Sequence, residues 1–142
     1  MIQKFNIESI KTVNKPGELC PFNIHEISKK LGINFKINNL FYITDLNSIK
    51  SRGNHANTNT SEIIICISGS FDIECFDGKE KFNYNLKKNE ALYIPNMIWL
   101  SFYNFKECIL LVLTSITPII EKESIYDIEE FKKIVNSINR IY

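Results

Sequence analysis

The sequence is poor in cysteine and arginine, and it has no hydrophobic run long enough to cross a bilayer. Its four cysteines form no C-x-x-C pair. Three of them, Cys66, Cys75 and Cys108, lie inside apolar strand-like segments, where a free cysteine behaves as a small hydrophobe. We therefore expect these three side chains to be core thiols.

The two arginines, Arg52 and Arg140, stand beside fifteen lysines that are spread along the chain, and the net charge is +1. A nucleic-acid interface normally needs a concentrated basic stripe. The sequence therefore predicts no binding to DNA or RNA.

The longest apolar runs, Ile63–Ile67 and Ile109–Leu113, have the length of a strand, whereas a membrane-spanning helix needs roughly 20 residues. The N-terminus, which begins Met1-Ile2-Gln3, has no apolar signal region and no small-residue cleavage site. We expect a cytoplasmic protein without membrane contact.

Apolar residues make up 44% and charged residues 23% of the 142 residues, which is ordinary for a globular protein. A chain of this length can bury a core without disulfide or metal support. No repeat, low-complexity tract or linker divides it. We expect one domain over residues 1–142.

Short segments rich in β-branched and aromatic residues, bounded by turn residues, recur along the chain. Ser68-Gly69-Ser70 and Asp77-Gly78 are tight-turn signals between such segments. This pattern predicts an all-β sandwich or barrel. The clearest strand segments are Leu40–Leu46, Glu62–Ile67, Phe71–Phe76, Ala91–Ile94, Trp99–Tyr103 and Cys108–Thr114.

Near the C-terminus the apolar residues change to helical spacing after Asp127, a candidate N-cap. A weaker helical pattern runs from Ile24 to Leu31 and ends at Gly32. Residues 2–14 have the character of edge strands. The apolar positions of the C-terminal helix are Ile128, Phe131, Ile134, Val135 and Ile138.

In the first cupin motif, two histidines and a glutamate face into the barrel. The same layout is found in the segment Arg52-Gly53-Asn54-His55-Ala56-Asn57, which is followed by Glu62 and Gly69. Asn57 stands where the second histidine belongs, and Leu100 stands where the second motif has its histidine. His55 and Glu62 alone do not supply the three or four N/O donors of a transition-metal site. We predict no bound metal and no cofactor.

The order of several further motifs over roughly residues 36–131 resembles the dTDP-sugar 3,4-ketoisomerases. The resemblance implies a cupin jelly roll that forms homodimers and needs no metal. It also implies conversion of dTDP-4-keto-6-deoxyglucose to its 3-keto isomer, in deoxyaminosugar biosynthesis for surface glycans. The motifs are Phe41-Tyr42-Ile43-Thr44-Asp45, Arg52-Gly53-x-His55-Ala56, Cys66-Ile67-x-Gly69-Ser70, Asp77-Gly78, Leu92-Tyr93-Ile94-Pro95-x-Met97-x-Trp99 and Leu111-Val112-Leu113-x-Ser115.

Such an isomerisation moves a proton between neighbouring carbons through an enediol, so it needs a base, an acid and hydrogen bonds to the oxygens. His55 matches the first family histidine, and imidazole titrates near pH 6.5. Asn57 cannot titrate, but its amide can hold an enediol oxygen while His55, Tyr42 or a water carries the proton. The predicted catalytic residues are therefore His55, Asn57 and Tyr42.

Other positions depart from the family pattern. Asn39 stands where an arginine is usual, Glu62 replaces a glutamine, and Leu100 replaces a polar residue after Trp99. Arg52, with Lys36 or Lys50, is expected to bind a pyrophosphate. An inward Glu62 needs a partner, for which His55 is the natural candidate. The predicted substrate-binding residues are Arg52, Glu62, Asn39, Trp99 and Leu100.

Plainer roles compete with these. Arg52 can equally be an exposed loop charge, and His25 a surface residue. Tyr42 and Trp99 can be core aromatics, because large aromatic side chains mostly fill β-sandwich interiors. Alternation along a strand turns either Phe41 or Tyr42 inward, but not both. The alternative function is a degenerate cupin that binds a sugar nucleotide or a partner protein without turnover. A third function, that of a metal-dependent cupin oxygenase, is disfavoured because Asn57 and Leu100 replace two of the metal-binding histidines.

Overall fold

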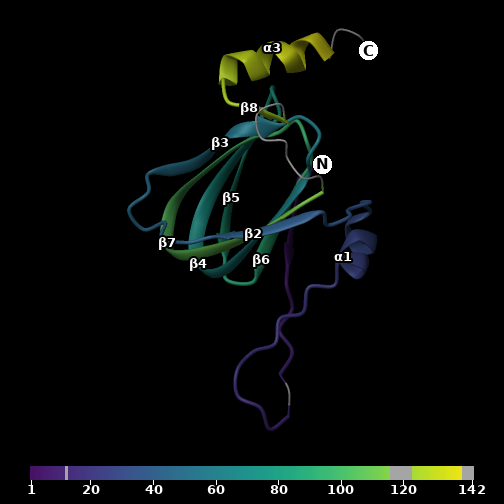
Figure 1. Ribbon diagram of the computed structural model, residues 1–142, viewed down its shortest axis with the longest axis vertical. Coiled ribbons are helices and arrows are strands. Elements are labelled where there is room, and N and C mark those ends of the chain that lie inside the picture. Colours follow the sequence, from purple (N-terminus) through teal and green to yellow (C-terminus); the bar gives the residue numbers. More distant parts are fainter. Residues whose placement is uncertain (12, 116–122, 139–142) are drawn as a thin grey trace.

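The structure is a computed structural model that describes residues 1–11, 13–115 and 123–138 (Figure 1). Its strands curve around a common interior, helix α3 covers one end, and helix α1 lies at the side of the sheet (Figure 1). The elements are β1 (Gln3–Asn6), α1 (Ile24–Leu31), β2 (Asn39–Ile43), β3 (Ser51–Asn57), β4 (Glu62–Phe76), β5 (Lys81–Lys87), β6 (Glu90–Ile94), β7 (Trp99–Thr114), β8 (Ser124–Ile125) and α3 (Ile128–Ile138).

The strand pairs are antiparallel throughout the described residues and follow the order β1-β6-β4-β7-β3-β8. Strand β2 also pairs with β7, and β5 pairs with β4. Strands β4 and β7 form the axis of the fold, since they pair from Glu62 opposite Thr114 to Phe76 opposite Trp99. The predicted all-β class with a C-terminal helix is confirmed.

Both axial strands are longer than the sequence indicated. Ser68-Gly69-Ser70, expected to be a turn, lies within β4, and Trp99–Tyr103 and Cys108–Thr114 are joined in β7. The register between the two strands shifts repeatedly from Cys66 to Asp72. Gly69 has φ +66°, and a Cβ there would overlap the Lys106 carbonyl oxygen. The glycine therefore permits a kink in a continuous strand, where β4 changes partner from β6 to β5.

Strand β5 was not among the predicted strands, although its residues carry a period-two signal. Phe82, Tyr84 and Leu86 alternate with polar residues and pack on the core. The preceding Asp77-Gly78 signal does begin the connection to this strand. Asp77 Oδ1 accepts hydrogen bonds of 2.8 Å from the backbone N–H groups of Lys79 and Glu80.

The two expected helices have the predicted bounds. Asn23 caps α1 through its side-chain oxygen, and Gly32 ends the helix in a left-handed conformation. Asp127 Oδ1 accepts from the N–H groups of Glu129 and Glu130 at the start of α3. The apolar face of α3 then buries Phe131 against the barrel end.

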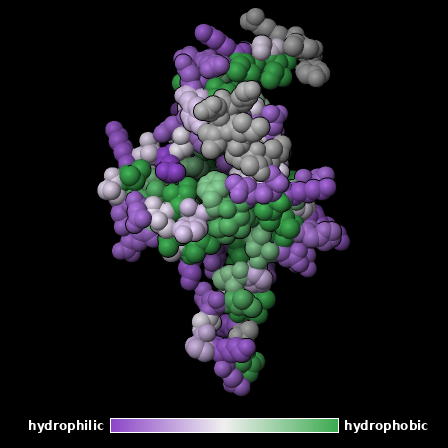
Figure 2. All heavy atoms as spheres, in the orientation of Figure 1, coloured by the Kyte–Doolittle hydropathy of each residue, from purple (hydrophilic) through white to green (hydrophobic). Residues whose placement is uncertain are grey.

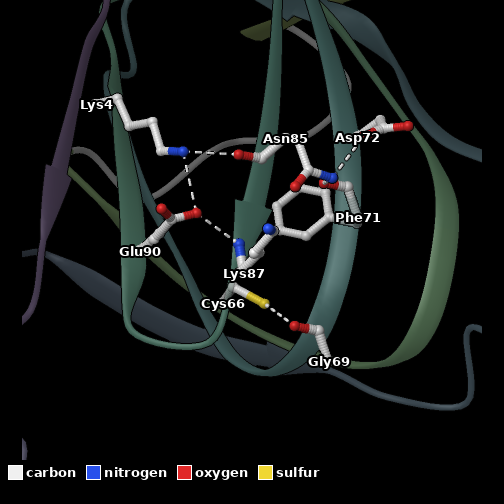
Figure 3. A network of polar contacts seen from close by, with 8 residues as sticks. All are labelled: Lys4, Cys66, Gly69, Phe71, Asp72, Asn85, Lys87 and Glu90. Carbon is white, nitrogen blue, oxygen red and sulfur yellow. Dashed lines mark hydrogen bonds and ion pairs between the residues drawn. The ribbon is translucent and has the colours of Figure 1, made fainter.

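The N-terminal strand is tied to the sheet by a network of polar contacts (Figure 3). Lys4 Nζ donates to the Asn85 carbonyl at 2.8 Å and pairs with Glu90 Oε2 at 3.0 Å, and the Lys87 N–H donates to the same oxygen at 2.8 Å. Of the expected N-terminal edge segment, only residues 3–6 form a strand, β1, which lies at one edge of the sheet. The three predicted core thiols are buried and free.

Candidate active site

A cavity of about 580 Å³ opens among strands β2, β3, β4 and β7. This volume lies within the usual range for small-molecule sites. These strands and the short strand β8 come from separate parts of the chain between residues 39 and 125, so the curvature of the sheet creates the site. Its lining comprises Asn39, Phe41, Ile43, Ser51, Arg52, Gly53, Asn54, His55, Asn57, Glu62, Ile64, Phe102, Val112, Thr114, Ser124 and Tyr126.

Strand alternation decides which side of β2 faces this cavity. Asn39, Phe41 and Ile43 line it, and Tyr42, between them, is 70% exposed. The position expected for Tyr42 is therefore corrected, because the pleat directs Phe41 inward. Asn39 lies at the rim, where its Oδ1 accepts the N–H of Leu40 at 3.0 Å.

A bulge in β3 brings Arg52 and His55 to the same cavity. Arg52 lies opposite Phe102 of β7 and Gly53 opposite Ser101, but His55 lies opposite Leu100, so the ladder skips Asn54. Residues that face each other in a ladder project to the same side, so the skipped residue changes the parity of the strand. Regular alternation would have directed Arg52 and His55 to opposite faces.

Gly53 makes this bulge possible. Its φ is +82°, and an added Cβ would meet Leu100 Cδ1 at 2.8 Å and Phe102 Cδ2 at 3.1 Å. Asn54, next to it, has φ +54°. A residue with a side chain at position 53 would be strained by both its backbone and its neighbours.

Asn57 joins two other polar residues at the inner end of the cavity. Its Nδ2 donates to Glu62 Oε1 at 3.1 Å, and its Oδ1 accepts from Ser124 Oγ at 3.1 Å. Asn57 and Glu62 are 7% and 8% exposed. The partner of Glu62 is thus Asn57, and the expected pairing of Glu62 with His55 is wrong.

Burial raises the pKa of Glu62 to about 7, although the hydrogen bond from Asn57 lowers it in part. Glu90 provides a contrast. Burial also raises its pKa, but the Lys87 N–H and the Lys4 ammonium outweigh that effect and lower its pKa below the usual value. The two carboxyls differ because Lys4 reaches Glu90, whereas Glu62 has an uncharged amide as its partner.

The loop between Asn57 and Glu62 is held from the other side by Glu123. The Glu123 carboxylate accepts from the N–H groups of Asn59 and Thr60 at 2.7 and 2.6 Å. These bonds lower the pKa of Glu123 against the opposing effect of burial. Glu123 thus anchors the loop that connects Asn57 to Glu62.

His55 lines the cavity, is half-buried, and contacts the aromatic ring of Tyr126, which was not among the predicted site residues. The ring centroids of His55 and Tyr126 are 5.7 Å apart with an interplanar angle of 40°. Tyr126 is 61% exposed, so it forms part of the cavity mouth. The only sequence signal for Tyr126 was its position just before α3, at the edge of the matched motifs.

Two predicted substrate-binding residues lie outside the lining. Trp99 is 7% exposed and packs against Phe131 of α3, with ring centroids 6.0 Å apart. Leu100 is 2% exposed and belongs to the main core cluster, directly across the ladder from His55. Hydrophobic burial places both in the core, so the structure does not bring them to the cavity lining as expected.

Cationic residues near the cavity are few. Arg52 lines it, is exposed, and forms no ion pair with any residue that the structure describes. Lys36 and Lys50 are exposed but are not lining residues. Arg52 is therefore the side chain best placed for a bidentate contact with a phosphate group.

Among the described residues, no three His, Cys, Asp or Glu side chains gather as a metal site would require. No helix in the described ranges is long and apolar enough to span a membrane. The cavity thus combines one histidine, one buried carboxyl, one arginine and several hydrogen-bonding groups.

An antiparallel barrel with such a cavity in its concave side is a cupin-type jelly roll. Residues 4–136 match the family described as "FdtA: WxcM-like, C-terminal", and the chain belongs to this family. WlaRA, a TDP-fucose-3,4-ketoisomerase from Campylobacter jejuni, is 38% identical, with a TM-score of 0.79 over 96% of this chain and 97% of that chain.

Two further relatives are more distant. A 3,4-ketoisomerase from Helicobacter canadensis is 29% identical, with a TM-score of 0.82 over 95% of this chain and 97% of that chain. The TDP-4-oxo-6-deoxy-alpha-D-glucose-3,4-oxoisomerase of Aneurinibacillus thermoaerophilus is 28% identical over 115 residues, which are 80% of this chain and 82% of that protein. The predicted family and fold are confirmed.

Proposed function

We propose that the protein is an isomerase that converts a dTDP-4-keto-6-deoxyhexose to its 3-keto isomer. The observation that carries this proposal is the cavity, where a histidine and a buried carboxyl lie together in a family that includes 3,4-ketoisomerases. Burial raises the pKa of Glu62 to about 7, so this carboxyl can exchange a proton near neutral pH, and histidine is the side chain most often used as a general acid or base. The reaction requires such exchange and no net oxidation.

His55 is proposed as the base that acts on carbon. It lines the cavity, is half-buried, and lies against the aromatic ring of Tyr126. A sugar ring that enters the cavity can therefore meet the imidazole directly. Asn57 is proposed to position the Glu62 carboxyl, since its amide is already engaged by Glu62 and Ser124.

The nucleotide part of the substrate is proposed to contact Arg52 and the rim residue Asn39. A guanidinium can bind two oxygens of a pyrophosphate at once, and the exposed Arg52 has no acidic competitor among the described residues. Asn39 supplies an amide at the same rim. Binding without turnover is not favoured, because the cavity holds a histidine together with a buried carboxyl whose pKa burial raises to about 7.

We also propose a single-domain protein that forms a homodimer in the cytoplasm and serves deoxyaminosugar synthesis for surface glycans. Strand β1 lies at an edge of the sheet, and Leu40 and Tyr42 of β2 are 55% and 70% exposed. Hydrophobic residues also gather over the middle of the face in Figure 2. An edge strand and exposed large side chains favour a protein partner, and free buried thiols suit a reducing compartment.

Incubation with dTDP-4-keto-6-deoxyglucose in D₂O tests the proposal. We expect exchange of the C3 proton and appearance of the 3-keto isomer by NMR. Tight binding of the nucleotide sugar without any exchange would instead support the binding-only alternative. No binding and no exchange would overturn both.

A further inference from the structure

The Glu62 carboxyl is the buried titratable group whose role the family pattern does not supply, since glutamine is the expected residue there. It begins β4, faces Thr114 across the β7 ladder, and lines the cavity. Asn57 donates to its Oε1, and Oε2 has no hydrogen-bond partner among the described residues. One oxygen is thus held while the other remains available to a ligand.

Within the described part of the chain, the carboxyl also has no counter-ion. The ion pairs of the described residues join Lys4 to Glu90, Lys81 to Glu74, Lys88 to Glu18 and Lys132 to Glu129, all away from this cavity. A buried carboxyl that meets only neutral dipoles retains its proton to a higher pH than an exposed one. Such a group can donate a proton as an acid and accept it again as a base at neutral pH.

Thr114 gives independent evidence that a ligand oxygen belongs beside Glu62. Its hydroxyl is buried, with the residue 1% exposed, and Oγ1 has no hydrogen-bond partner among the residues that the structure describes. Thr114 lines the same cavity directly across the ladder from Glu62. A buried hydroxyl without a partner is costly, so a ligand oxygen at this place would satisfy it.

We propose that Glu62 is the second proton-transfer residue of the isomerase, acting on the substrate oxygens while His55 acts on the carbons. Thr114 hydrogen-bonds the same oxygens. The inference rests on the proposed function, and it assigns to this carboxyl the acid–base role that Asn57 cannot perform. Neutral pH populates both states of the group, because burial raises the pKa of Glu62 to about 7.

The protons and electrons balance over one cycle. In the first half, the C3–H bond breaks, its proton goes to His55, and its electron pair forms the C3–C4 double bond. The C4 carbonyl oxygen takes the proton of Glu62, which gives the enediol. In the second half, the O3 hydroxyl returns a proton to Glu62 as the C3 carbonyl forms, and C4 takes the proton from His55. Both residues end in their starting states, and no oxidant is needed.

The test compares Glu62→Gln with Glu90→Gln in the full-length protein. Glutamine can still accept from Asn57 but cannot titrate, so we expect kcat to fall about 100-fold with little change in KM. The wild-type kcat/KM should decline as pH rises through about 7, because Glu62 must begin protonated, and Glu62→Gln should lack this decline. Glu90→Gln, which changes a carboxyl outside the cavity, should keep the wild-type rate and profile.

A second measurement does not depend on the variant. The side-chain carboxyl carbon of Glu62, followed by NMR in the wild-type protein, should titrate near pH 7, and titration near the ordinary 4.5 would overturn the proposal. A Glu62→Gln variant with wild-type kcat and an unchanged pH profile would overturn the Glu62 role alone. Absence of C3 exchange in the wild type would overturn the proposed function, and this inference with it.

Discussion

The amide of Asn57 donates a 3.1 Å hydrogen bond to the carboxyl of Glu62, and this pair closes the inner end of the cavity. The first cupin motif places a histidine where Asn57 stands. The substitution therefore removes one titrating group, while its neighbour Glu62 has a pKa raised to about 7 by burial. Substitutions of Asn57 and of Glu62 test the role of this pair separately.

Replacement of His55 should remove most of the activity and leave the fold intact. His55→Ala or His55→Asn should lower turnover about 100-fold or more, the usual contribution of general acid–base catalysis. His55 is half-buried at the cavity, so its loss leaves no large void in the core. C3 proton exchange followed by NMR measures the effect, and full exchange in His55→Ala would contradict the assignment.

Asn57→His should keep or raise the activity. An imidazole N–H at this position can still donate to Glu62, and it restores a titrating group at the inner end of the cavity. Asn57→Leu is the matched control, because it removes both hydrogen bonds. It should raise the pKa of Glu62 above about 7, since donation from Asn57 lowers that pKa. A large loss of turnover in Asn57→His would show that the amide itself is required.

Glu62 should make the folded protein less stable as the solution becomes alkaline. Its folded-state pKa, about 7, exceeds the ordinary 4.5, so its stabilising contribution is complete below pH 4.5 and is lost as pH rises through 7. The loss is on the order of 3 kcal/mol.

Glu62→Gln should therefore gain stability relative to wild type between pH 5 and pH 8, as measured by urea unfolding. Glu90→Gln should show no such change between pH 5 and pH 8, because the pKa of Glu90 is lowered and its stabilising contribution is lost only as pH falls below 4.5. Equal pH dependence of wild type and Glu62→Gln would be inconsistent with a protonated Glu62.

Gly53→Ala should be more harmful than Gly32→Ala. Both glycines have positive φ, +82° and +67°, but Gly32 has nothing within 4 Å of an added Cβ, whereas Gly53 has Leu100 at 2.8 Å. We expect about 1 kcal/mol of destabilisation at Gly32 and about 2 kcal/mol or more at Gly53. Activity should fall only in Gly53→Ala, because the bulge orients Arg52 and His55. Urea unfolding and turnover assays on both variants decide this.

Activity should not depend on a metal ion. Two of the four cupin ligand positions hold Asn57 and Leu100, and neither an amide nor an alkyl group replaces an imidazole well. Elemental analysis of purified protein and assays after chelator treatment check this expectation. A stoichiometric transition metal whose removal abolishes turnover would contradict it.

The sequence could specify features that depend on residues near one another in the chain. The bounds of α1 and α3 were predictable because Asn23, Gly32 and Asp127 act locally as caps. The spacing of Arg52, His55 and Glu62 was likewise visible in the motif. The continuity of β4 was not, because Gly69 has the local properties of a turn residue and only pairing with β7 keeps it in a strand.

The all-β class, the bounds of the two helices, the family and the loss of two metal-ligand positions could be inferred from the sequence. Which side chains meet depended on the folded chain. It turned Phe41 rather than Tyr42 to the cavity, buried Trp99 and Leu100 in the core, and joined Glu62 to Asn57 instead of His55. The physical reason is that burial and strand register depend on partners far apart in the chain, and these set both the direction of each side chain and the pKa of Glu62.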